Sequence, residues 1–443
     1  MKKVLVISET IFSDRLFKTL GLESSSMFKS TLISSTQLND IEKKYFVQIN
    51  QNKSNFYKFK IIKFLSTIHK YVSPLNINRT SLNDHLEIDS QNWSFTKKAL
   101  FRCIIYLFIL FKPVRKISLI LLKRFSPKLD EEFENYLDKF DAVFFFSLGN
   151  LKQTLILPIY KYFNKKKLPS ICYIQSWDNP STKGYTLIKP TITFTWTELM
   201  RKELVQYMDF NFNETKSVGT PIFANGNKKT KNSRKKHILF ATKSPKTYPH
   251  NFEISKIIAK AIKNEDINYT VRIHPLAVSQ SFINERDKII ELSKNYGFNV
   301  LVPSSSSKIL LNEEYETLSK NIFYDASLFI SVFSTMNLEA AFMNIETLNI
   351  DFDGNESDKF SYRQSIYFDR RQIHNRRALS YGFIKNIKNE NELVSAINQH
   401  IINGMDKNNL SRRELVKNEC EPTFEKQNLE FTIHKLIKKN NRN

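Results

Sequence analysis

The sequence is poor in cysteine and has no apolar run long enough to cross a bilayer. Its 443 residues contain three cysteines (Cys103, Cys172 and Cys420), which are widely spaced and form no C-x-x-C pair. This usage argues against a disulfide framework or a zinc site and favours a reducing compartment. The apolar segments 100–111 and 117–122 both fall short of the ~20 residues that a membrane-spanning helix needs. The apolar start of the chain, Met1–Ser8, is too short for a signal peptide. We therefore expect a cytoplasmic protein.

Several catalytic motifs are missing as well. The chain contains no G-x-x-x-x-G-K-S/T, G-x-S-x-G, H-E-x-x-H or G-x-G-x-x-G segment. Their absence argues against P-loop enzymes, lipase-like hydrolases and dinucleotide-dependent dehydrogenases. The acidic segment Asp351–Gly354 lacks the ligand spacing of a metal cage. We therefore predict no metal site and no resident cofactor.

Positive charge is in excess. The formal net charge is +23 at pH 7, so nucleic acid, anionic lipid headgroups and nucleotide phosphates are candidate partners. No recognisable nucleic-acid-binding module accompanies the charge, which argues against nucleic acid. Segments 56–65 and 100–124 combine apolar residues with flanking lysines and arginines, as helices at an anionic membrane surface do. The alternative for both segments is a buried or core-facing helix with a solvated basic side.

Strands and helices alternate along most of the chain. The runs 140–147, 169–174 and 191–196 are apolar and β-prone, and each is followed by a polar turn or a helical pattern. After a basic stretch at 226–236 the alternation restarts at His237. This pattern predicts an α/β protein with two Rossmann-like, doubly wound domains that face each other across a cleft. The expected boundaries are 1–225 with a basic insertion at about 36–128, a linker at 226–236, a second domain at 237–400, and a C-terminal helix and tail at 401–443.

In the first domain, polar and ionisable side chains are concentrated in the loop 174–184, which follows the predicted strand 169–174. Loops at the carboxyl ends of parallel strands are where open α/β sheets bind ligands. Asp178 is our candidate general base, and Lys183 is a candidate for positioning the base or a substrate phosphate. The alternative for Asp178 is an Asx-type brace of the loop. The remaining acceptor-side candidates are Ser176, Trp177, Asn179 and Gly184.

In the second domain, three clusters follow predicted strands. The loop after residue 241 offers hydroxyls, amines and amides that suit a phosphate, and the helix predicted after Ser334 begins with Ser334 as its N-cap. His274 ends a strand before Pro275 and can donate to a phosphate or to a leaving-group oxygen. Glu339 lies one helical turn after Thr335, on the side where ribose hydroxyls would need an acceptor. The complete set of donor-side candidates is Thr242, Lys243, Ser244, Arg272, His274, Pro275, Ser334, Thr335 and Glu339.

Segments 176–184, 195–198, 218–223, 272–275 and 331–335 together resemble the GT-B class of glycosyltransferases, in particular the bacterial surface-carbohydrate branch. The segment Ser176–Gly184 resembles the S-W-D-N-x-x-x-K-G loop of that branch. The branch is similar to CDP-glycerol glycerophosphotransferases and to bacterial Kdo- and sialyltransferases. Asp178 occupies the place of the histidine base of the glycerophosphotransferases. The resemblance covers about residues 140–350.

This resemblance implies a metal-independent glycosyltransferase of surface polysaccharide synthesis, such as capsule or lipopolysaccharide, that acts at the inner face of the plasma membrane. A nucleotide-activated donor would bind the second domain, and a glycan or lipid-linked saccharide acceptor would enter from the first. His274 would then stabilise the negative charge that develops on the departing nucleotide. The alternatives are a CDP-glycerol-type polyol-phosphate transferase, a nucleotide-sugar 2-epimerase and, from a different class, a basic nucleic-acid-binding protein.

Overall fold

The computed structural model forms two compact units. The first comprises Met1–Ile222 with Glu419–Asn443, and the second comprises Phe223–Asn418. Residues 1–8, 16–34, 93–111, 129–146, 153–178, 188–220, 236–304, 313–355, 364–404 and 426–440 are described, with short pieces between them. Residues 226–235 of the predicted linker at 226–236, and all of the predicted basic helix at 56–65, lie outside the described residues.

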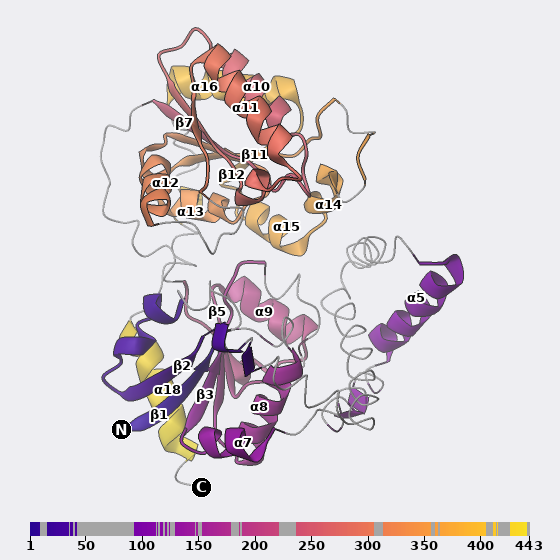
Figure 1. Ribbon diagram of the computed structural model, residues 1–443, viewed down its shortest axis with the longest axis vertical. Helices are drawn as coiled ribbons and strands as arrows, with labels where there is room; N and C mark the ends of the chain where they lie inside the picture. The colour runs from indigo at the N-terminus through magenta and orange to yellow at the C-terminus, as the bar shows by residue number, and fades with distance from the viewer. Residues whose placement is uncertain are drawn as a thin grey trace. The chain divides into compact units, whose positions relative to one another are not determined.

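The first unit is built on a parallel six-stranded sheet with the order β2-β1-β3-β4-β5-β6 (Figure 1). The chain first adds a strand on one side of β1 and then builds outward on the other side, so the order reverses between β1 and β3. The central strands are fully buried, as expected when helices cover both faces of a parallel sheet. The strands are β1 (Lys2–Ile7), β2 (Phe28–Ile33), β3 (Ala142–Phe145), β4 (Ser170–Tyr173), β5 (Ile192–Thr195) and β6 (Thr215–Ser217).

The helices of the first unit come from distant parts of the chain. They are α5 (Phe95–Leu110), α7 (Glu131–Leu137), α8 (Gln153–Lys165), α9 (Glu198–Tyr207) and α18 (Lys426–Asn440). Helix α18 belongs to the first unit although more than 200 residues separate it from the previous helix of that unit. It buries Leu429, Ile433 and Ile437 at a spacing of four residues. The end of the chain therefore returns to the first unit, whereas the sequence pattern predicts only a polar helix and tail.

The second unit contains another parallel six-stranded sheet, with the order β12-β11-β10-β7-β8-β9. Its order reverses between β7 and β10, with three strands on each side, as in dinucleotide-binding folds. The strands are β7 (His237–Ala241), β8 (Asn268–Arg272), β9 (Asn299–Leu301), β10 (Leu328–Ser331), β11 (Glu346–Ile350) and β12 (Ile384–Ile387). The helices are α10 (Asn251–Ala261), α11 (Ile283–Tyr296), α12 (Glu313–Asp325), α13 (Met336–Phe342), α14 (Ile366–Arg370), α15 (Ile373–Ser380) and α16 (Glu390–Asn403).

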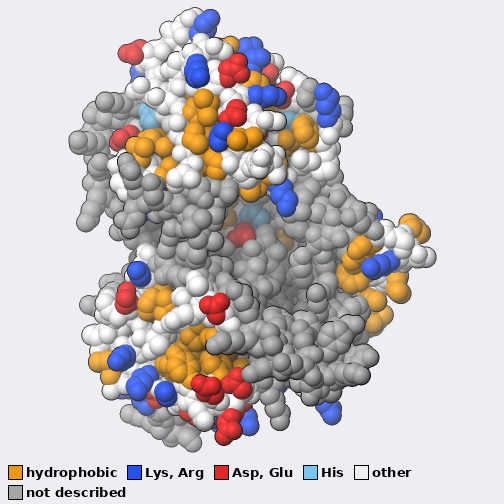
Figure 2. Space-filling view, in the orientation of Figure 1, with side chains coloured by type: hydrophobic (Ala, Val, Ile, Leu, Met, Phe, Trp, Pro, Cys, Tyr) orange, Lys and Arg blue, Asp and Glu red, His pale blue; other side chains and the backbone are white. Residues whose placement is uncertain are grey.

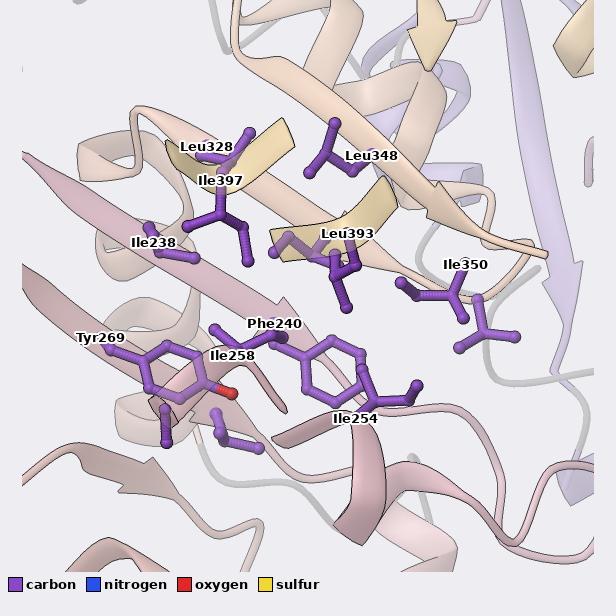
Figure 3. Close-up of a cluster of buried hydrophobic side chains, with 14 of the residues drawn as sticks. Ile238, Phe240, Ile254, Ile258, Tyr269, Leu328, Leu348, Ile350, Leu393 and Ile397 are labelled. Carbon is purple, nitrogen blue, oxygen red and sulfur yellow. The ribbon is translucent and has the colours of Figure 1, made fainter. Parts of the chain in front are cut away.

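Alternation along the strands gives the second sheet two apolar faces. Ile238 and Phe240 of β7 pack with residues of α10 and α16, as Figure 3 shows. Leu239 between them points to the opposite face and packs with Phe323 of α12 and Ala340 of α13. Successive side chains of a strand point to opposite faces, so one apolar strand anchors both helical layers. The predicted strands of the second half are thus confirmed in type, whereas β2 and β12 were missed.

The described residues include no helix long and apolar enough to cross a membrane.

Candidate functional site

The sequence-predicted donor residues gather at the carboxyl edge of the second sheet. Open α/β sheets bind ligands outside the carboxyl ends of their strands, where the strand order reverses. In the second unit this point lies between β7 and β10. The loop from Thr242 follows β7, and Ser334 and Thr335 follow β10. Arg272 and His274 come from the end of β8, the other neighbour of β7.

A direct contact joins the loops after β7 and β8. The backbone N–H of His274 donates to the hydroxyl of Thr242 (2.8 Å), and the Thr242 N–H donates to the carbonyl of Arg272 (3.0 Å). Thr242 itself is buried. The hydroxyl of Thr242 therefore positions the loop that carries His274.

The ring of His274 is oriented by its own loop. The N–H of Leu276 donates to His274 Nδ1 (3.1 Å), and His274 caps a 3-10 turn, Pro275–Val278, that begins with the buried Pro275. A neutral imidazole that accepts through Nδ1 carries its proton on Nε2. The partly exposed ring thus has the tautomer needed to donate from Nε2 to an anion.

Arg272 and Glu339 meet around the start of α13. Arg272 Nη1 lies 2.8 Å from the sulfur of Met336. Burial raises the pKa of Glu339 above its ordinary value, while the charges of Arg272 and Lys320 oppose that shift. Glu339 is only partly exposed. A carboxyl group in this setting is a suitable acceptor for hydroxyl groups of a ligand, because hydrogen bonds to its charged form offset the cost of burial.

The beginning of α13 differs from the prediction. The N-cap is Thr335, and its side chain makes no capping bond, whereas Ser334 was predicted to cap the helix. The Ser334 hydroxyl still accepts from the N–H of Met336 (3.2 Å). The reason lies in Phe333, whose φ of 42° turns the backbone before the helix and delays its start by one residue. Thr335 is exposed, so its hydroxyl faces outward.

The turn at Phe333 is held by asparagines that the sequence reading did not select. The N–H of Phe333 donates to Asn349 Oδ1 (2.7 Å), and the Asn349 amide donates to Asn386 (2.8 Å). Asn386 donates in turn to Asp351 (2.7 Å), whose other carboxylate oxygen accepts from Arg370 (2.8 Å). A left-handed backbone at a bulky residue is strained and persists only when its surroundings fix it. This relay of side chains supplies that constraint.

The loop after β7 is held by hydrogen bonds to the side chain of Asn251. Asn251 accepts from the Lys243 N–H (2.8 Å) and donates to the carbonyls of Lys243 and Tyr248 (3.0 and 2.9 Å). The Asn251 amide also donates to Glu285 (3.1 Å). Burial raises the pKa of Glu285 to about 7, although the hydrogen bond from Asn251 and the charge of Lys288 both act to lower it. These contacts fix the loop that holds Thr242 and Ser244.

The Lys243 ammonium is already engaged. Its Nζ lies 2.5 Å from Asp369 Oδ1, and both side chains are largely buried. Burial raises the pKa of Asp369, and the charge and hydrogen bond of Lys243 oppose that shift. Lys243 was selected as a phosphate ligand, but here it ties the loop to α14. A buried pair of this kind is costly to break from one side, by about 3–5 kcal/mol.

In the first unit, the predicted acceptor loop follows β4. The indole of Trp177 is buried and lies 6.4 Å from that of Trp196, centroid to centroid. Trp196 Nε1 donates to the carbonyl of Ile174 (2.7 Å). The side chain of Trp177 therefore anchors this part of the loop in the core, and Ser176 and Asp178 on either side of it are partly exposed.

Asp178 is partly exposed beside this anchor. The hydroxyl of Ser176 donates to its carboxylate. The Asx-type brace weighed as an alternative would use Asn179 and the amides after it, which lie outside the described residues. A hydroxyl donor also stabilises the ionised form of the carboxylate. Lys183, Asn179 and Gly184 lie outside the described residues.

The missed residues left different signals in the sequence. Asn349 stands between the apolar residues Leu348 and Ile350 of a buried strand, and a buried amide there needs a partner. That signal could have been read from the sequence. The partners, Phe333 and Asn386, could not, because they depend on which strands pair.

Sequence comparisons with known protein families and with characterised proteins find no match. Structural comparison finds the UDP-GlcNAc 2-epimerase of Neisseria meningitidis bound to UDP-GlcNAc, with 12% identity and a TM-score of 0.51, over 99% of this chain and 100% of that one. A glycosyltransferase from Rickettsia africae matches with 11% identity and a TM-score of 0.48, over 99% of both chains.

The chain therefore has a GT-B-like fold of two Rossmann-like units. This confirms the predicted fold class. The narrower resemblance to CDP-glycerol glycerophosphotransferases or sialyltransferases gains no support from these structures.

Proposed function

We propose that the protein is an enzyme acting on a nucleotide-activated sugar, with the nucleotide held by the second unit. The observation that carries this proposal is the gathering of His274, Ser334, Thr335 and Glu339 around the reversal of strand order between β7 and β10. This is the part of an open α/β sheet that binds nucleotides.

Each group has a role that its contacts allow. The Nε2 proton of His274 and the outward hydroxyl of Thr335 would donate to the phosphates. Arg272 would add positive charge near them, and Glu339 would accept from the ribose. When the bond between sugar and phosphate breaks, the negative charge that grows on the departing nucleotide would be stabilised by His274.

Two reactions are compatible with this site. In the first, epimerisation, the sugar ends with a changed configuration on the same nucleotide, so no acceptor is needed. The similarity to the Neisseria meningitidis epimerase supports this reaction at the level of the fold.

In the second reaction, glycosyl transfer, Asp178 would deprotonate an acceptor hydroxyl that attacks the sugar carbon. The acceptor would be a glycan or a lipid-linked saccharide, and surface polysaccharide would be the product. The resemblance of the loop 176–184 to that of surface-carbohydrate transferases supports this reaction. The carboxylate of Asp178 follows β4 and accepts a hydrogen bond from the hydroxyl of Ser176.

One experiment tests the class and separates the reactions. The protein is incubated with UDP-, CDP- and GDP-sugars, with and without short saccharide acceptors, and the products are identified by NMR. Epimerisation predicts a new sugar configuration on the intact nucleotide without acceptor. Transfer predicts free nucleotide and an extended acceptor. If the nucleotide sugars remain unchanged and unbound, the proposal is wrong.

A further inference from the structure

Helix α5 of the first unit has two apolar faces. One face packs inward through Phe101 and Ile105, which are 7% and 1% exposed. The other carries Leu100, Leu107 and Phe111, which are 65%, 50% and 54% exposed, with the exposed Cys103 between them. At 3.6 residues per turn, positions 100, 103, 107 and 111 form one stripe opposite the buried face.

This stripe is unusual for a helix of a water-soluble unit, whose outer face is normally polar. Figure 2 shows orange hydrophobic side chains, with basic ones in blue, at the place that α5 occupies in Figure 1. A continuous exposed apolar patch marks a surface that binds something. The stripe is therefore a candidate binding surface.

The charge around the helix identifies the occupant that fits this surface. Residues 91–128 contain nine lysines and arginines and no aspartate or glutamate. At the beginning of α5, the ammonium of Lys97 lies 4.6 Å from the ring centre of Trp93. Tryptophan and basic residues beside an apolar helical face are typical of helices at a membrane interface. A positive, apolar surface is complementary to anionic lipid headgroups over an acyl layer.

A second copy of the chain is a poorer occupant for the same reason. In a two-fold contact the same patch meets itself, so the basic residues of one copy would face those of the other. Like charges brought together without partners oppose association.

We propose that α5 binds the surface of an anionic bilayer, with its stripe of Leu100, Leu107 and Phe111 in the headgroup region. This inference goes beyond the proposed function and does not depend on it. It would bring the first unit to a lipid-linked acceptor, if the reaction is a transfer.

Vesicle flotation tests the proposal with the full-length protein. Vesicles of phosphatidylcholine alone are compared with vesicles that contain about 30% phosphatidylglycerol, at about 0.1 M and about 0.5 M salt. We expect binding to the anionic vesicles, with a loss of roughly ten-fold or more at the higher salt because the Debye length shortens. Binding to phosphatidylcholine alone should be weaker by a similar factor.

Two variants separate the apolar and the electrostatic contributions. Replacing Leu100, Leu107 and Phe111 by serine should weaken vesicle binding roughly a hundred-fold, because three large side chains no longer enter the interface. Replacing Lys97 and Lys98 by glutamate should weaken binding to anionic vesicles roughly ten-fold or more. The matched control is Ile402→Ser, on α16, which removes a residue that is 79% exposed and should leave binding unchanged.

The proposal is overturned if the protein does not float with anionic vesicles, or if the triple serine variant floats as well as the wild type. It is also overturned if the wild type is a dimer that the triple variant converts to a monomer, since the stripe would then be a contact between copies. Nucleotide binding, measured on the same variants, should be unchanged. Membrane binding and the proposed enzymatic function can thus fail independently.

Discussion

The two sheets of the molecule end in differently built carboxyl edges. In the second unit, polar side chains cross-link the loops, as the asparagines Asn251, Asn349 and Asn386 show. In the first unit, the described part of the predicted acceptor loop is anchored by the buried indoles of Trp177 and Trp196. Hydrogen bonds constrain the orientation of the groups that they join. Apolar packing holds a side chain in the core but tolerates changes in the side chains around it.

This difference bears on which of the two units would hold the phosphates of a ligand. A phosphate site needs donors at set angles, and the second edge has the bonds that hold them. Under the proposed function the second unit would bind the nucleotide, and if the reaction is a transfer, Asp178 of the first unit would be the base. The following predictions test that contrast.

The largest effect is expected from Asp178→Asn. If Asp178 is the general base of a transfer reaction, turnover should fall by about 10²–10⁴-fold, since an amide cannot accept the proton. Nucleotide affinity should be unchanged, because the second unit holds the donor. Steady-state kinetics and titration calorimetry measure the two quantities. Ser176→Ala serves as control and should cost far less; wild-type turnover of the asparagine variant would rule out the base.

Trp177→Ala should destabilise the protein by about 3–5 kcal/mol, as expected for a buried tryptophan. Removal of the indole opens a cavity against Trp196. Thermal or urea unfolding measures the loss, and Trp177→Phe should recover part of it. A stable alanine variant with lower acceptor affinity would show instead that the indole contacts a substrate.

His274→Ala should weaken nucleotide binding by roughly ten-fold to a hundred-fold, the worth of one or two charge-assisted hydrogen bonds. His274→Gln retains an N–H donor and should recover part of the affinity. Calorimetric titration with the preferred nucleotide measures both. Equal nucleotide affinities for the wild type and the alanine variant would show that His274 does not contribute to nucleotide binding.

Glu285→Gln should change how stability depends on pH. Burial raises the pKa of Glu285 to about 7, above the value of about 4.3 in an unfolded chain. The folded state then holds a proton that the unfolded state has released, so stability falls as pH rises from about 4.3 to about 7. The loss is about 3–4 kcal/mol in the wild type and should vanish in the variant. Parallel slopes for the two proteins in urea unfolding at a series of pH values would contradict this.

The sequence predicts the fold well where strands are apolar and buried. The runs before Trp177 and before Ser334 stand out because a strand covered on both faces has no polar positions. Strand β2 was missed because its burial is incomplete, and β12 because it is short and contains Lys385. Edge strands of this kind lack the strong pattern of central ones.

The candidate site could be predicted only in part. The sequence predicts that the loops carrying Thr242, His274 and Ser334 lie at one edge of the second sheet, because residues that follow parallel strands meet there. The engagement of Lys243 by Asp369 could not be seen, since more than a hundred residues separate them. The same holds for the relay from Asn349 to Arg370, which exists only once β11 pairs with β12. Long-range polar pairs depend on the assembled sheet and leave no local pattern.

The measurement that tests the central claim most directly is photo-crosslinking with an azido analogue of the nucleotide that stabilises the protein best, followed by mapping of the labelled peptides. Our account predicts labelling in the second unit, within residues 242–276 and 331–344, and competition by the unmodified nucleotide. Labelling confined to the first unit, or no nucleotide that binds at all, would contradict it.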